Sequence, residues 1–153
     1  MEVVRFRLNF LFSVNIQYFN EDVSFPDIDQ EKLNKWISFS IQQEGKKTDS
    51  ISIIFCSDRY LLEINQTYLK HDFFTDIVTF DYVNGNQISG DLFISCDRVQ
   101  ENAADFQVDF FDELHRVIIH GILHLLGYKD KDTAEKERMT SKEDFYLGEL
   151  TRF

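Results

Sequence analysis

Two histidines, a glycine and an aspartate form a regularly spaced group near the C-terminal end of the sequence. The run HGILHLLGYKD places His120 and His124 four residues apart, with Gly127 and Asp130 following at intervals of three. Four helical residues turn through about 400° and rise about 6 Å, so both imidazoles lie on one face. Two imidazoles at this spacing can bind one metal ion. Gly127 can end the helix and let Asp130 turn back to the same ion. The spacing therefore predicts three ligands from one local element, the number that a catalytic zinc typically takes from its protein.

The alternative is an amphipathic helix that carries two incidental histidines. The chain has only 4 histidines, and two of them take the i, i+4 positions, which favours the metal site. His115 lies five residues before His120 and would point about 140° away on a helix, so we expect a core or surface histidine there. Metalloproteases with an H-E-x-x-H motif use the residue after the first histidine as general base. Gly121 stands at that position and cannot act as a base, which argues against peptide hydrolysis.

The elements that must hold these residues alternate along the chain. A period-two apolar pattern predicts a strand over 6–18, interrupted near Ser13. A short buried strand is predicted over 49–57, and two more strands over 76–83 and 87–95 are joined by a hairpin at 84–86. Helical spacing predicts five helices: one capped by Asp29 and ended by Gly45, one capped by Ser57 or Asp58 and running to Tyr68, one capped by Ser95 or Asp97 and running through Ala103, one from Glu113 to about Leu126 capped by Asp109 or Asp112, and one from about Thr133 to Leu150. These elements predict the α+β class, with a mixed sheet of about four strands and about five helices packed on it.

The bulk composition limits what the protein can bind. The chain has 153 residues, which fits one domain over 1–153. Its formal net charge of −11 excludes a broadly basic nucleic-acid-binding surface. One local run, residues 129–142, mixes five basic with four acidic side chains, and it is more typical of a solvated helix than of a binding patch.

Compartment is predicted from the cysteines and the N-terminus. Cys56 and Cys96 both lie in apolar, strand-like runs, so we expect core thiols in a reducing compartment, although the sequence leaves a disulfide open. No apolar run approaches the roughly 18 residues of a membrane helix. The apolar N-terminal stretch resembles a signal peptide only faintly, because Asn9 and Ser13 interrupt it. A cytoplasmic location is predicted.

Three ordered motifs resemble one known family. The histidine run resembles the YbeY signature H-G-x-L-H-L-x-G-Y-D-H, with matches at His120, Gly121, Leu123, His124, Leu125, Gly127 and Tyr128. The segment INQTYLKHDFFTDIVTF resembles L-N-x-x-Y-R-x-x-D-x-x-T-D-V-L-S-F, with matches at Asn65, Tyr68, Asp72, Thr75, Asp76 and Phe80. GDLFIS, which contains Asp91, resembles the strand G-D-I-x-I-S. The resemblance runs from about Ile51 to the C-terminus, and the N-terminal third adds little.

The resemblance implies a zincin-like α+β fold and a function. The YbeY family comprises single-strand-specific endoribonucleases implicated in rRNA maturation. By resemblance we expect one Zn²⁺ ion per chain, held by His120, His124 and Asp130, and a role in 16S rRNA 3′-end maturation and ribosome quality control. The expected partners are single-stranded rRNA and the ribosome or its proteins, with neither DNA nor a membrane among them.

This sequence departs from the family pattern at two places that matter for chemistry. Asp130 stands where the family has a third histidine. A carboxylate can ligate zinc, so we expect the site to be kept, with a higher pH optimum because added negative charge makes zinc-bound water less acidic. Leu69 stands where the family has an arginine thought to serve phosphate chemistry. Lys70 is the predicted substitute and His71 a second candidate.

Other polar motif residues have structural explanations beside catalytic ones. Asp91 is predicted as a catalytic residue that lines the cleft, although it could simply bond backbone. Thr75 and Asp76 could contact substrate or only shape the turn into the next strand. The sequence does not show which residue is the general base. Two rival functions stay open here, a non-catalytic ribosome-maturation factor with a structural metal and a metal-dependent hydrolase of another substrate.

Overall fold

The computed structural model describes residues 16–153. The described part contains one sheet with the strand order β1-β2-β4-β3, formed by β1 (Ile16–Asn20), β2 (Lys47–Cys56), β3 (Ile77–Asp81) and β4 (Gln87–Ser95). The pairs β1/β2 and β2/β4 are parallel, and β3 is antiparallel to β4. The sheet is therefore mixed, as predicted. Most of the strand expected over 6–18 lies outside the described residues, and within them β1 covers 16–18 and continues to Asn20.

Five α-helices surround this sheet in the described part of the chain. They are α2 (Gln30–Gln43), α3 (Asp58–Leu69), α4 (Cys96–Phe106), α5 (Phe110–Leu125) and α6 (Thr133–Glu149), and a short 3-10 turn (Leu150–Arg152) follows α6. Asp29, Ser57 and Ser95 cap their helices by accepting backbone N–H bonds, while Asp109 precedes α5 without a side-chain bond. The predicted α+β class, with about four strands and about five helices, is confirmed.

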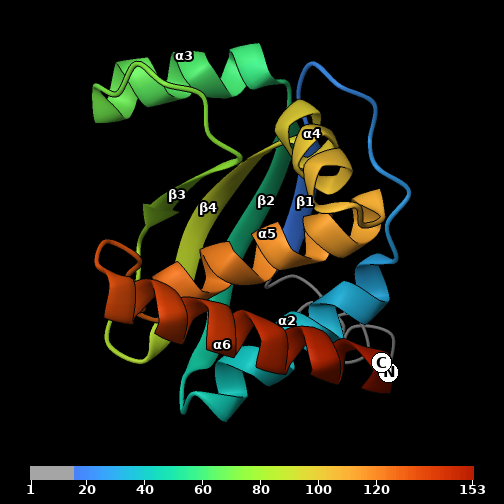
Figure 1. Cartoon of the computed structure of the whole chain (residues 1–153). Coiled ribbons are helices and arrows are strands. Elements are labelled where there is room, and N and C mark those ends of the chain that lie inside the picture. Colours follow the sequence, from blue (N-terminus) through green and yellow to red (C-terminus); the bar gives the residue numbers. More distant parts are fainter. Residues whose placement is uncertain (1–15) are drawn as a thin grey trace, which may run out of the picture.

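The helices cover both faces of the sheet. Figure 1 shows α5 crossing one face, with α6 running alongside it. The main core forms on this face from α2, α5, α6 and the strands, and Trp36 of α2 donates from its indole nitrogen to the Tyr146 carbonyl of α6 at 2.7 Å. A smaller cluster joins α3 to β2 and β3 through Leu61, Ile64 and Val78. Val78 packs with α3, whereas its neighbour Ile77 lies against Gly121 of α5. Because neighbouring strand side chains point to opposite faces, α3 and α5 pack on opposite sides of the sheet.

Both cysteines have the character that their apolar contexts predicted. Cys56 is fully buried and Cys96 partly so, and both are free thiols. Burial raises the pKa of the Cys56 thiol to about 12, so this thiol is inert at neutral pH. Within the described range 16–153, none of the helices has the length and apolar character needed to cross a membrane.

Gly121 lets α5 lie directly on the sheet. A Cβ atom at this position would lie 2.6 Å from Ile77 Cδ1 and 2.6 Å from Leu92 Cδ2. Both contacts are with buried or half-buried side chains of β3 and β4. The glycine in the middle of the histidine run therefore brings the two flanking histidines close to the sheet, which gives it a packing role of its own.

Replacing Gly121 with alanine should destabilise the protein. Overpacking of this kind typically costs about 1–3 kcal/mol, against a gain of about 1 kcal/mol from better helix propensity. The control is Gly148→Ala on α6, where a Cβ meets nothing within 4 Å and only the propensity gain applies. Urea unfolding of both variants checks this. A Gly121→Ala protein as stable as the Gly148→Ala protein would show that close packing is not the reason for the glycine.

Candidate metal centre

Three ligand atoms converge at the C-terminal half of α5. The Nε2 atoms of His120 and His124 lie 3.0 Å apart, and each lies 3.3 Å from Oδ2 of Asp130. Zinc–ligand bonds of 2.0–2.1 Å at a tetrahedral angle place neighbouring donors about 3.3 Å apart. The three side chains are partly buried and form a group that could hold a metal ion. The structure thus brings together the three side chains that the spacing predicted as ligands.

Both histidines offer the correct nitrogen to this point. His124 Nδ1 lies 2.9 Å from the Tyr128 carbonyl oxygen, which can only accept, so Nδ1 carries the proton. His120 Nδ1 lies 2.6 Å from a carboxylate oxygen of Glu143 and likewise donates. In each neutral ring, Nε2 then carries no proton and has a free electron pair. Two such pairs and a carboxylate oxygen repel one another unless a cation or proton lies between them, so the donor set fits a metal ion.

A Schellman turn at the end of α5 carries the chain back to the histidines. Gly127 has a φ of 101°, which is a left-handed conformation that favours glycine. Its N–H donates to the His124 carbonyl at 3.0 Å, and the N–H of Tyr128 donates to the Leu123 carbonyl at 3.0 Å. These two bonds define the motif. The reversal places Asp130 beside the helix that it has just left.

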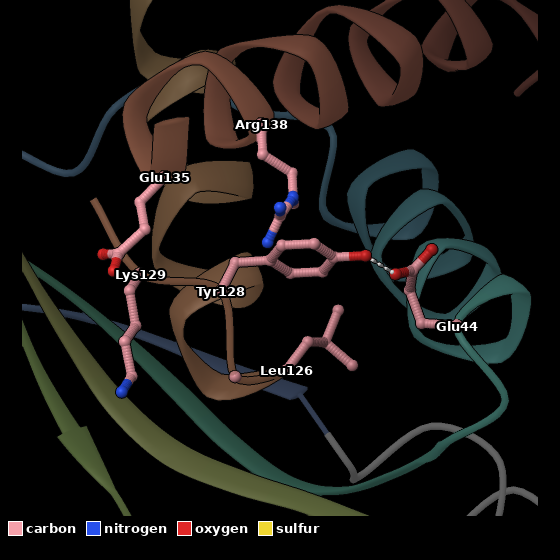
Figure 2. A pocket seen from close by; sticks show the side chains of 7 residues that line it. Glu44, Leu126, Tyr128, Lys129, Glu135 and Arg138 are labelled. Atoms are coloured by element: carbon pink, nitrogen blue, oxygen red, sulfur yellow. Dashed lines mark hydrogen bonds between the residues drawn. The ribbon is translucent and has the colours of Figure 1, made fainter. Parts of the chain in front are cut away.

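The loop that carries Asp130 is anchored to α2. Figure 2 shows the Tyr128 ring extending toward Glu44, to which its hydroxyl donates. Glu44 also accepts from the Tyr146 hydroxyl and from Lys142 Nζ at 3.1 Å. Burial by itself would raise the pKa of Glu44, but these three donors lower it overall. The ionised carboxylate therefore ties the ligand loop to both α2 and α6, beside a cavity of about 530 Å³ that does not include the metal ligands.

Glu143 of α6 supports His120 from behind and was not identified from the sequence. One carboxylate oxygen bonds His120 Nδ1, and the other accepts from Arg116 Nη1 at 3.0 Å. Arg116 also donates to Asp144 at 2.8 Å. Burial would lower the pKa of His120, yet the bond to Glu143 and its charge raise it overall. A carboxylate behind a metal-binding imidazole fixes the ring's tautomer and orientation.

A signal for Glu143 was present in the helical pattern. Met139, Tyr146 and Leu150 are buried along one side of the last helical segment, at the spacing expected of a core-facing stripe. Glu143 lies between them on the same stripe, four residues after Met139. An acid at the centre of an apolar stripe predicts a buried partner, although it cannot say which residue that partner is.

A cavity of about 740 Å³ opens beside the three ligands. Besides these three residues, its lining comes from the C-terminal half of α3, from the loop after it, from β3 and from Lys131. The motif residues Asn65, Thr75 and Asp76 all belong to this lining. Burial raises the pKa of Asp76, although the nearby His120 acts in the opposite direction. The upstream motif and the histidine run therefore meet at one cavity.

Of the two residues predicted to contact phosphate, His71 lines the cavity and Lys70 does not. Leu69 and His71 line the cavity, but Lys70 between them is not among the lining residues. Lys70 is the C-cap of α3 with a φ of 55°, so the helix has already ended there. Its side chain is exposed.

Asp91 is not brought to the metal ligands. It lies opposite Phe80 and Ser52 in the sheet, and its neighbour Leu92 faces α5 at Gly121. Because neighbouring strand residues face opposite sides, Asp91 faces away from α5. Asp91 is also absent from the residues that line the cavity of about 740 Å³, so the prediction that it lines the cleft is wrong.

His115 is a partly buried histidine outside the ligand group, as expected from its spacing. Its ring packs edge-on against Trp36, with the centroids 6.0 Å apart. Burial lowers the pKa of His115, so the ring is neutral at physiological pH. It contributes to packing between α2 and α5.

Known proteins resemble this chain over nearly its whole length. Residues 15–151 match the family model described as Endoribonuclease YbeY. Relatives with that same description are 53% identical in Parabacteroides distasonis (88% of this chain, 95% of the relative) and 49% identical in Bacteroides thetaiotaomicron (87% and 97%). The solution structure of TM1509 from Thermotoga maritima is 28% identical, with a TM-score of 0.62 and 88% coverage of both chains. The resemblance seen in the three motifs is confirmed, and the chain belongs to the endoribonuclease YbeY family.

Proposed function

We propose that this protein is a metal-dependent endoribonuclease that cleaves single-stranded rRNA. The observation that carries the proposal is the convergence of His120, His124 and Asp130 at one point beside a large cavity, in a chain of this family. The proposed process is 16S rRNA 3′-end maturation and ribosome quality control, in the cytoplasm and in contact with the ribosome. We further propose that residues 1–153 fold as one domain, which the family match over 15–151 supports.

The proposed metal is one zinc ion per chain, because two imidazoles and a carboxylate are a common set of zinc ligands. When bound, the ion supplies Lewis-acid polarisation of a phosphoryl oxygen and of the attacking water. The chain's own part is preorganisation. The Tyr128 carbonyl keeps the proton on Nδ1 of His124, and Glu143 keeps the proton on Nδ1 of His120. The Nε2 atoms of both rings therefore need no reorientation to bind a metal ion. Arg116 holds Glu143 in place and compensates part of its buried charge.

Basic side chains near the cavity are the proposed phosphate contacts. Lys131 lines the cavity directly, and we retain Lys70 as a contact because its flexible side chain starts between two lining residues. Either ammonium can stabilise negative charge that develops on the phosphate. Asp91 has no contact with substrate in this proposal, because it does not line the cavity.

The rival functions fit the site less well. A structural zinc site is closed by four protein ligands, whereas here the described chain offers a group of three that lies in the wall of a cavity. A peptide hydrolase of the H-E-x-x-H type needs a glutamate where Gly121 packs against the sheet. The open position beside three ligands favours a catalytic metal.

Incubation with RNA tests the proposal. Zinc-loaded protein should cleave a single-stranded fragment from the 16S rRNA 3′ region and leave a matched duplex intact. A chelator should abolish cleavage, added zinc should restore it, and His124→Ala should be inactive under all conditions. Cleavage that survives chelation, or its absence with every divalent metal tried, would contradict the proposal.

A further inference from the structure

Large aromatic side chains are exposed around the loop between α3 and β3. Phe73 is 56% exposed, Phe74 is 53% exposed, and Tyr68 near the end of α3 is 68% exposed. Grouped exposure of large apolar side chains typically marks a binding surface, because a soluble protein otherwise buries them. Phe73 also lines the cavity that contains the metal ligands.

The loop holds Phe73 in a fixed position. Asn65 is buried and bonds the loop twice: its side-chain amide donates to the Phe73 carbonyl at 3.0 Å, and its backbone carbonyl accepts from the His71 N–H at 3.1 Å. Gln66 donates to Asp72 at 2.5 Å. Phe73 is thus presented by an ordered loop, and the position of Asn65 in the family motif receives a structural explanation.

Phe73 and His71 form a stacked pair in the wall of the cavity. Their ring centroids lie 5.1 Å apart, and the ring planes differ by 21°. Phe74, by contrast, lies under the guanidinium of Arg98, 5.4 Å from its ring centroid, and it does not line the cavity. Of the two exposed phenylalanines on this loop, Phe73 is the one that lines the cavity.

The charge of the cavity limits how RNA can bind there. Three carboxylates line the cavity, those of Asp76, Asp81 and Asp130. A single lysine or arginine side chain, that of Lys131, lies among the described lining residues. The whole chain has a net charge of −11. Phosphate contacts usually supply most of the affinity for nucleic acids, and this surface offers few of them. We therefore expect contacts with the uncharged bases to supply a large share of the binding free energy, beside the phosphate contacts proposed for Lys131 and Lys70.

We propose that Phe73, backed by His71, is a stacking platform for an RNA base beside the metal centre. The platform rests on the proposed RNA substrate, and it names the contact that recognises it. Single strands can splay out a base and stack it on an aromatic ring, whereas a duplex hides the faces of its bases. The platform therefore selects single strands through stacking, with little dependence on sequence.

Binding of Phe73→Ala to RNA tests the platform. The probe is a fluorescein-labelled oligoadenylate, followed by fluorescence anisotropy with chelator present so that no cleavage occurs. Loss of one stacking contact should weaken binding by roughly 5- to 150-fold. Phe73→Trp should bind as tightly as the parent. The control is Phe106→Ala at the end of α4. Phe106 is similarly exposed (64%, against 56% for Phe73) but lies outside this cavity, so this variant should bind normally.

An oligomer of the same length without bases separates stacking from backbone contacts. The parent should bind it weakly, and Phe73→Ala should bind it no more weakly than the parent does. Unchanged oligoadenylate binding by Phe73→Ala would overturn the platform and leave the aromatic group as a protein-docking surface. Equal weakening in Phe106→Ala would overturn it as well. The parent protein could bind RNA and yet fail to cleave it with every metal tried. That result would contradict the proposed function while leaving this test of the platform intact.

Discussion

Asp130→Ala protein is expected to fold normally but to lose its zinc and its ribonuclease activity. The carboxylate supplies one of three donor atoms, 3.3 Å from each histidine nitrogen, and alanine leaves only two. Removing an outer partner of a ligand typically costs 10- to 100-fold in metal affinity, so losing a ligand itself should cost more than roughly 100-fold. Zinc content after dialysis against a competing chelator, measured beside RNA cleavage, checks this.

Asp130→His is the matched control for that loss. It restores the histidine of the family signature and keeps three donors, so zinc and activity should remain. A neutral ligand makes zinc-bound water more acidic than a carboxylate does, so the pH optimum of Asp130→His should lie below that of the parent. Unchanged zinc content in Asp130→Ala would show that Asp130 is not a ligand. An unshifted pH profile in the histidine variant would contradict the electrostatic argument.

Glu143→Ala is expected to have the second-largest effect. It removes the partner of His120 Nδ1 and one of the two partners of Arg116. Zinc affinity should fall by about 10- to 100-fold, because His120 is no longer held in the ligating tautomer. The free energy of unfolding of the metal-free protein should also fall by about 1–3 kcal/mol, which is the cost of leaving buried polar groups unpaired. Zinc titration and urea unfolding measure the two effects separately.

Asp144→Ala separates the role of Glu143 from that of Arg116. Asp144 bonds the same guanidinium, but its side chain is 60% exposed and does not touch His120. An exposed pair of this kind contributes about 0–1 kcal/mol, and zinc affinity should not change. If Glu143→Ala and Asp144→Ala weakened zinc binding equally, the effect would come from Arg116 and not from orientation of His120.

The three candidate metal ligands were predictable because they lie within eleven consecutive residues. Helix geometry fixes the relation of His120 to His124, and a glycine turn fixes the return of Asp130, so no distant contact is needed. Glu143 was not predicted because its partnership depends on how α6 packs against α5. The packing role of Gly121 was missed for the same reason, since it depends on Ile77 and Leu92 of the sheet.

Errors and open alternatives arose where one side chain had two plausible uses. The helix over residues 96–106 had two candidate caps, and the structure uses Ser95 because Asp97 instead accepts from the backbone N–H of Asp58 at 2.9 Å. Asp91 was placed in the cleft because its motif adjoins a strand, but the face of a strand depends on register. Here the pairing of β4 with β3 and the contact of Leu92 with α5 turn Asp91 the other way.

Stepwise return of zinc to metal-free protein tests the central claim most directly, because it follows binding and RNA cleavage in one sample. If His120, His124 and Asp130 form the catalytic metal centre, cleavage of a single-stranded rRNA fragment should start near zero. It should rise in proportion to bound zinc and level off at one zinc per chain. Full cleavage without zinc, or one tightly bound zinc with no cleavage, would contradict the account.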